Sequence, residues 1–395
     1  METLILGWFV MVHTGSVMLL TAFGSLHFLG TLVAPMFGVL GDRLGARTML
    51  CAMRAIYAGL AVTLMALALT DLLTPAWVLV VATLAGIVRP NDLVMRNAII
   101  GETIPPEHVI NALSMSRASM DSARVAGALA GAGLSTVLGV GPAYAFITLL
   151  YLTSLALSFG IARSRPAPDP SAAPRGLASA AVSLGVARPS GYRDVKDGLV
   201  YVLTTPTLLA VMCLAFLINL TAYPISGGLL PYVAKRIYMV DATGLGWLVA
   251  SFSAGALVGS IAMVVTGGPR HTERATLVHA VLWYALLLAF GHVQSFGLGV
   301  ALLLLAGFVQ SVAMISLMGT ILAVGDPRFR ARVMGVRTLA VYGLPLGLMG
   351  SGVLIEHAGY PLTVSVLCAV GFAFTLVIGV RWRASLWHAR RAVVS

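Results

Sequence analysis

Long, continuously apolar runs recur from one end of this 395-residue chain to the other and restrict its fold more than any other feature. A helix needs roughly 20 apolar residues to cross a hydrocarbon core about 30 Å thick. Eleven runs reach that length: 17–40, 48–69, 76–98, 112–138, 142–161, 207–234, 243–266, 275–292, 296–323, 333–355 and 361–380. Because these runs do not alternate between apolar and polar residues, they predict helices and exclude the strands of a membrane barrel.

The composition agrees with this interpretation. Hydrophobic residues make up 59% of the chain and charged residues only 10%, and the mean hydropathy is +0.95. Such values lie far outside the range of soluble globular proteins. The chain is therefore predicted to be an all-α polytopic membrane protein.

The first apolar stretch, residues 1–13, is shorter than the others. Thirteen helical residues cover less than about 20 Å, which is too short for a straight helix that crosses the membrane. A cleaved signal peptide is a weak alternative, because the stretch has neither a basic start nor a small-residue cleavage site. We expect residues 1–13 to be the outer half of a truncated first span. Two explanations stay open: the first residue is an internal start within an ordinary carrier, or the first helix is incomplete.

Arginine dominates the basic residues, and its placement predicts the orientation. Arginines cluster in the segments that would face one side, whereas the other side receives only Lys235 and Arg236. The positive-inside rule makes the arginine-rich side cytoplasmic, together with the C-terminus. The use of arginine in place of lysine fits a GC-rich bacterial genome, so we expect a bacterial cytoplasmic (inner) membrane. The net charge of +11 then predicts contact with anionic lipid headgroups, and the absence of interleaved aromatic residues argues against nucleic acid.

Residues 163–198 interrupt the apolar pattern with a segment rich in proline, alanine and serine, which is typical of a flexible linker. The predicted organisation is an N-terminal bundle (1–162), this cytoplasmic linker (163–198), a C-terminal bundle (199–382) and a basic tail (383–395). The two halves also resemble each other, since 105–134 and 326–354 both run from a proline turn through a polar start into a glycine-containing helix. Such duplication is typical of transporters that rock two bundles about a central site.

The polar stretch GVLGDRLGAR at 38–47 resembles the cytoplasmic loop signature of the major facilitator superfamily. Segments 14–16, 105–113, 192–206, 244–259 and 330–333 are most similar to the branch of the enterobactin exporter and the macrolide-efflux proteins. The resemblance implies two pseudo-symmetric six-helix bundles. It implies a cytoplasmic gate formed by Gly38, Asp42, Arg43, Gly45, Arg47 and Glu102.

Physical roles can be assigned to this predicted gate. The glycines permit a tight turn and close helix approach, and Asp42 can lie at the positive end of a helix. Arg43 and Arg47 can pair with Glu102 and hold the cytoplasmic side shut in one state. The alternative is that these charges only set the membrane topology.

Charged residues also lie within two predicted spans. Arg89, Asp92 and Arg96 share one face of one helix at positions i, i+3 and i+7. Arg117, Asp121 and Arg124 share one face of the next helix at positions i, i+4 and i+7. A charge in the membrane costs at least about 2.5 kcal/mol, so these side chains should face protein or water. The functional hypothesis is that Asp121 or Asp92 exchanges a proton while a neighbouring arginine binds an anionic substrate. The alternative is a structural network of ion pairs.

Further candidate residues lie on helices that the resemblance places at a central cavity. Asn219, Tyr223 and Gln310 are candidate lining residues, although a hydrogen bond between helices is the more common role for such groups. Gly127, Gly131 and Gly133 are predicted to allow close helix packing. In drug antiporters of this superfamily a proline follows one of these glycines, and here Ala128 takes its place.

Other functional classes lack their motifs. The chain has no nucleotide-binding motif for an ATP-driven pump, and no constellation typical of a membrane enzyme or a metal site. We therefore predict a monomeric secondary transporter without a cofactor, which uses the proton gradient to export a small amphiphilic or anionic molecule such as a drug, siderophore or metabolite. The alternative is a truncated, non-transporting membrane protein or scaffold of the same fold.

Overall fold

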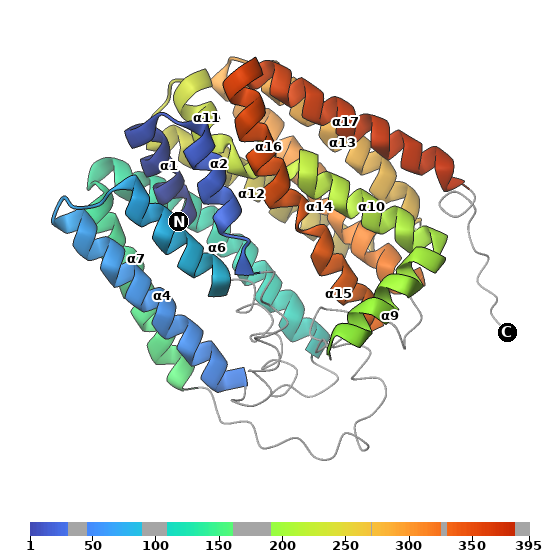
Figure 1. Cartoon of the computed structure of the whole chain (residues 1–395), viewed down its shortest axis with the longest axis horizontal. Coiled ribbons are helices and arrows are strands. Elements are labelled where there is room, and N and C mark those ends of the chain that lie inside the picture. Colours follow the sequence, from blue (N-terminus) through green and yellow to red (C-terminus); the bar gives the residue numbers. More distant parts are fainter. Residues whose placement is uncertain (31–45, 89–108, 161–190, 270, 325–329, 384–395) are drawn as a thin grey trace. The chain divides into compact units, whose positions relative to one another are not determined.

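The computed structural model describes residues 1–30, 46–88, 109–160, 191–269, 271–324 and 330–383, with some side chains left out. Every regular element in these ranges is a helix (Figure 1). Contacts divide the chain into two compact units, each assembled from two segments. Unit 1 comprises Met1–Tyr192 and Leu230–Trp247, and unit 2 comprises Arg193–Leu229 and Leu248–Ser395.

Eight helices among the described residues are long and apolar enough to cross a membrane: Arg47–Leu69, Val140–Phe159, Pro206–Ile237, Ala242–Thr266, Thr272–His292, Phe296–Ile321, Val336–Ala358 and Tyr360–Arg381. These correspond to eight of the eleven predicted runs. Two further runs, 17–40 and 76–98, extend beyond the described residues, which contain the shorter helices Val17–Leu26 and Pro75–Val88. The remaining run lies in α6 (Val109–Val137), a 29-residue helix whose charged first half lowers its hydropathy.

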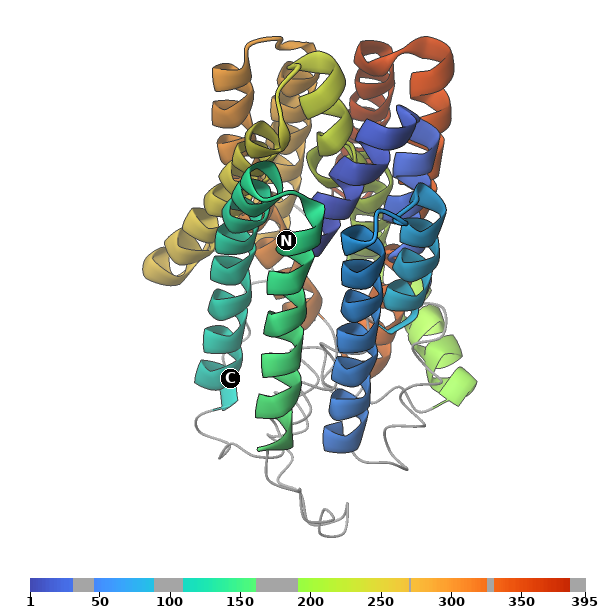
Figure 2. The same cartoon turned by 90° about the vertical axis from the view of Figure 1, so that its left-hand side faces the viewer.

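In unit 1, α7 (Val140–Phe159) packs along α4 (Ala46–Leu69) and also contacts α6, and it lies between these two helices in Figure 2. Helix α1 (Glu2–Thr14) packs on α2 (Val17–Leu26) and on α6. Between α1 and α2 the chain reverses at Gly15, which has a φ of 63° that favours glycine. The Ser16 hydroxyl then accepts a hydrogen bond from the Leu19 amide at 3.3 Å and caps α2.

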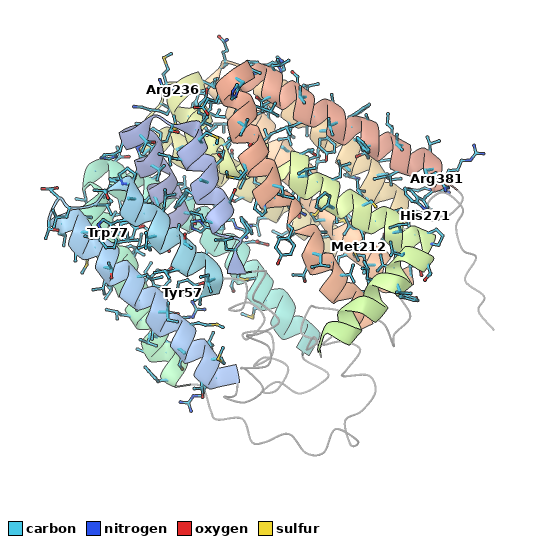
Figure 3. The ribbon with its side chains drawn as sticks, in the orientation of Figure 1. Tyr57, Trp77, Met212, Arg236, His271 and Arg381 are labelled. Carbon is cyan, nitrogen blue, oxygen red and sulfur yellow. The ribbon has the colours of Figure 1, made fainter. Side chains whose placement is uncertain are left out.

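In unit 2, α13 (Thr272–His292) packs between α14 (Phe296–Val324) and α17 (Tyr360–Arg381). Helix α10 (Pro206–Thr221) packs on α15 (Arg330–Ala340), α16 (Gly343–Ala358) and α17. The amphipathic helix α9 (Gly191–Thr204) precedes α10. Met212, labelled on α10 in Figure 3, belongs to an apolar core that α9, α14 and α15 complete.

Within unit 2, glycine allows two helices to touch backbone to backbone at residues after Leu248. A Cβ atom at Gly255 of α12 (Ala242–Thr266) would overlap the carbonyl oxygen of Leu304. In the same way, a Cβ atom at Gly307 of α14 would overlap the carbonyl oxygen of Phe252. These two glycines therefore fix where α12 and α14 cross.

The predicted span at 207–234 is not one regular helix. After α10 the chain forms a π-helical turn η3 (Pro224–Gly228), a short α11 (Leu230–Tyr232) and a second π-helical turn η4 (Val233–Ile237). Pro224 lacks an amide hydrogen, and Gly227 and Gly228 follow it, so regular α-helical bonding is interrupted here. The chain passes from unit 2 to unit 1 at this break, between Leu229 and Leu230.

Candidate functional site

Most residues of the predicted cytoplasmic gate lie outside the described residues, as do three of the charged candidates. These are Gly38, Asp42, Arg43, Gly45 and Glu102 of the gate, and Arg89, Asp92 and Arg96. Arg47 is described, near the start of α4, and its guanidinium donates a hydrogen bond to the backbone carbonyl of Phe159. This carbonyl belongs to the last turn of α7, where the helix dipole favours a positive charge. Arg47 therefore links the adjacent ends of α4 and α7.

Asp121 and Arg124 form an ion pair on α6, with 3.5 Å between Oδ1 of Asp121 and Nη1 of Arg124. The two ends of this pair differ in their surroundings, because Asp121 is buried whereas the Arg124 side chain is 60% exposed. Arg117 belongs to the same helix, but its side chain is outside the described set.

The three candidate glycines of α6 do not share one role. A Cβ atom at Gly131 would come within 2.7 Å of Met1 Cγ, and one at Gly127 within 3.6 Å of the Met1 nitrogen. A Cβ atom at Gly133 would have no described neighbour within 4 Å. Gly133 is two residues from Gly131, a rotation of about 200° around the helix axis, so it cannot share the packed face.

The three candidate cavity residues of unit 2, Asn219, Tyr223 and Gln310, make different hydrogen bonds. The Asn219 side chain donates to the carbonyl of Ala215 at 2.9 Å, within its own helix. Gln310 of α14 instead donates from Nε2 to the hydroxyl of Tyr223 at 2.7 Å. The Tyr223 ring also meets Trp283 edge to face, with 5.2 Å between ring centroids. The structure thus joins Tyr223 to Gln310 across two helices and leaves Asn219 apart.

Unit 1 contains a cavity of about 410 Å³ that the sequence analysis missed. We call it the Glu2 cavity; its lining residues are Met1, Glu2, Thr3, His27, Arg54, Tyr57, Ala85, Ile147, Leu150, Tyr151 and Ser154. The Tyr151 hydroxyl donates a hydrogen bond to Glu2 Oε2 at 2.7 Å. Tyr57, labelled in Figure 3, stacks on Tyr151 with 5.6 Å between ring centroids. The sequence offered one sign of this cavity, which is the acid Glu2 within an apolar stretch. No sequence motif connects Glu2 with Tyr151.

The described residues contain no group of three His, Cys, Asp or Glu side chains that could hold a metal ion. His27 lies in the Glu2 cavity, where its Nδ1 is 2.9 Å from the carbonyl oxygen of Phe23. Cys51 and Cys213 are half-buried and Cys368 is buried, and all three are free thiols.

Comparison with known proteins places this geometry in context. The family model described as "transmembrane secretion effector" matches residues 6–394. The human organic anion transporter MFSD10 (TETRAN) has a similar structure, with a TM-score of 0.60, 18% identity, and coverage of 92% of this chain and 83% of that one. The nucleoside transporter NupG has a TM-score of 0.66 and 14% identity, covering 98% and 95%. Both similarities concern the fold, and no curated protein matches the chain significantly.

Proposed function

Because this chain belongs to the transmembrane secretion effector family and is thus a multi-pass transporter of the major facilitator superfamily, we propose that it exports a small amphiphilic or anionic molecule in exchange for protons. The proposed location is the bacterial cytoplasmic membrane, with the C-terminus inside and the proton gradient as the energy source. Within the superfamily, we propose the branch of the enterobactin exporter and the macrolide-efflux proteins.

The observation that carries this proposal is the ion pair of Asp121 and Arg124. A buried carboxylate beside an exposed guanidinium combines a proton acceptor with an anion-binding group. When Asp121 takes up a proton, it loses its charge and its attraction for Arg124, and the guanidinium becomes available to an anionic group. When the proton leaves, the carboxylate competes for Arg124 again and favours release of the anion.

Alternating access requires that these events be coupled to opening on opposite sides of the membrane. We propose that the polar loop at 38–47 acts as the cytoplasmic gate, with Arg43 and Arg47 pairing with Glu102 when that side is closed. Arg47 already bonds the end of α7, so α4 and α7 would move together as the gate opens. Asp92, flanked by Arg89 and Arg96, is a second proposed proton acceptor.

The test is proton movement in everted membrane vesicles that contain the protein. Vesicles are energised until their lumen is acidic, a panel of amphiphilic and organic anionic compounds is added, and lumenal pH is followed with a fluorescent dye. A transported compound should release protons from the lumen in wild-type vesicles and not in vesicles without the protein. If no compound moves protons or accumulates, the non-transporting alternative is favoured.

A further inference from the structure

We infer that α9 lies in the membrane–water interface, with an apolar patch of Leu199, Val200 and Leu203 inserted among the phospholipid chains. The inference goes beyond the proposed function, because it concerns where one helix meets the bilayer and not what the protein transports. It gives α9 two partners, which are the protein core on one face and lipid on another.

One face of α9 is occupied by the protein. Gly198 and Val202 are buried and lie one helical turn apart, so they share this face. Val202 belongs to the apolar core that α9 shares with α10, α14 and α15. This contact fixes the rotation of α9 about its own axis and therefore determines which of its residues point away from the core.

A second apolar face of α9 is only partly covered by the described residues. Leu199, Val200 and Leu203 are between 41% and 55% exposed. Positions i, i+1 and i+4 are adjacent on a helix, so these three residues form one patch. The patch lies about a third of a turn around the axis from the buried face. A contiguous apolar patch of this kind indicates a partner, whereas a single exposed apolar residue does not.

The position of the patch in the chain identifies lipid as this partner. Helix α10 begins at Pro206, which is also the first residue of the apolar span Pro206–Ile237. Leu203 precedes Pro206 by three residues, which reach at most about 11 Å. The headgroup layer beside the hydrocarbon core is itself about 5–8 Å thick. Leu203 therefore lies within this layer or directly beside it, whichever way α9 points.

Thr205 separates α9 from the membrane-spanning helix that follows. Its φ of −105° and ψ of 102° are extended, so the two helices are not continuous. Figure 1 shows the sharp change of direction between α9 and α10. An amphipathic helix that turns away from a span is typical of helices that lie along the membrane surface. In that position α9 holds the start of α10 at a fixed depth.

The charges of α9 leave apolar contact as the main attraction to the bilayer. The sequence of α9 contains the basic residues Arg193 and Lys196 and the acidic residues Asp194 and Asp197. These charges cancel, so α9 as a whole gains little from a negatively charged surface. Contact between the patch and lipid should therefore not depend on the charge of the lipid.

The experiment places a fluorescent nitrobenzoxadiazole label on single cysteines of the full chain, after its native cysteines have been replaced by alanine. The labelled proteins are reconstituted into phosphatidylcholine vesicles. Leu203→Cys and Leu199→Cys carry the label on the patch. Thr204→Cys is the matched control, because Thr204 is also exposed but is rotated about 100° from Leu203 around the helix.

Two quenchers report the surroundings of each label, a nitroxide on the lipid acyl chains and iodide in the water. At Leu203 the label should be quenched by the nitroxide, and iodide should quench it about threefold less than at Thr204. At Thr204 the nitroxide should be the weaker quencher. Replacing half of the phosphatidylcholine by phosphatidylglycerol should leave both patterns unchanged.

Equal quenching by iodide at Leu203 and Thr204 would overturn the inference, because the patch would then face water. Protection of Leu203 from both quenchers would also overturn it, since another part of the protein would cover the patch. Quenching by lipid that requires phosphatidylglycerol contradicts apolar contact as the cause. Leu199→Cys decides where the Leu203 variant does not fold. The proton-movement assay is separate, so failure of the proposed function leaves this inference standing.

Discussion

At the scale of single residues, the two partners of the ion pair in α6 lie in different environments. Asp121 is buried, and its partner Arg124 is largely exposed. Neutralising the buried partner costs little in packing, because asparagine has nearly the same shape as aspartate. Charge and structure can therefore be separated at this position.

We expect Asp121→Asn to abolish proton-coupled transport while membrane insertion and the amount of folded protein stay at the wild-type level. The amide of asparagine carries no charge and cannot take the proposed place of Asp121 as proton acceptor beside Arg124. The measurement is proton efflux from everted vesicles, with Asp71→Asn as the control at an exposed acid outside α6. Equal transport by Asp121→Asn and wild type would contradict this role.

The bond between Tyr223 and Gln310 gives a second residue-scale prediction. Tyr223→Phe leaves the Gln310 amide without the 2.7 Å acceptor and should reduce stability by about 1 kcal/mol. Thermal unfolding in detergent would measure this loss. In a double-mutant cycle with Gln310→Leu, the coupling energy should also be about 1 kcal/mol.

Additive losses in that cycle would show that the bond contributes nothing to stability. A large loss of transport by Tyr223→Phe without loss of stability would instead favour the other predicted role of Tyr223, which is contact with the substrate.

At the scale of helices, close backbone approach decides which faces pack. A Cβ atom at Gly347 of α16 would overlap the carbonyl oxygen of Leu220 in α10, and one at Gly343 would lie 2.6 Å from that of Phe216. Gly350 is on the same helix, but a Cβ atom there would have no described neighbour within 4 Å. The sequence alone does not distinguish these three glycines. They differ in whether backbone atoms of α10 lie next to them.

We therefore expect Gly347→Ala to reduce the stability of the protein by about 1–3 kcal/mol, the usual range for overpacking. Gly350→Ala is the matched control and should leave stability unchanged or slightly raised, because alanine favours the helix. Unfolding temperatures of the two variants in the same detergent test this. Similar values for both would mean that α10 and α16 do not touch at Gly347.

At the scale of the whole molecule, the placement of arginine predicts the orientation in the membrane. Helices α13 and α17 of unit 2 pack together and run in opposite directions, so the start of α13 and the end of α17 coincide. Figure 3 shows His271 and Arg381 at this shared end. Arg274 and Arg383 are at this end too. By the positive-inside rule, we propose that this end faces the cytoplasm.

Single cysteines test this orientation, once Cys51, Cys213 and Cys368 have been replaced by alanine. Gln294→Cys lies between α13 and α14, at the opposite end of α13, and should react with a membrane-impermeant maleimide in intact cells. Arg383→Cys should react only after the membrane is permeabilised. The reverse pattern would invert the predicted topology.

The sequence alone was sufficient for the class of fold and for most helix positions. The predicted runs 48–69 and 243–266 differ by one residue at their starts from the helices Arg47–Leu69 and Ala242–Thr266. Membrane insertion depends on the summed apolarity of about 20 consecutive residues, and that sum is local. The break after Thr221 was missed because the apolar run continues through Pro224, although the backbone does not stay regular.

Only the tertiary structure decided which polar groups meet. Glu2 and Tyr151 are 149 positions apart, and Tyr223 and Gln310 are 87 apart. In a soluble helix the apolar stripe indicates which face is inside, whereas lipid and protein interior are both apolar, so a membrane helix carries little of that information. The sequence therefore determined that this protein crosses the membrane as helices, and packing determined which of its few polar side chains contact one another.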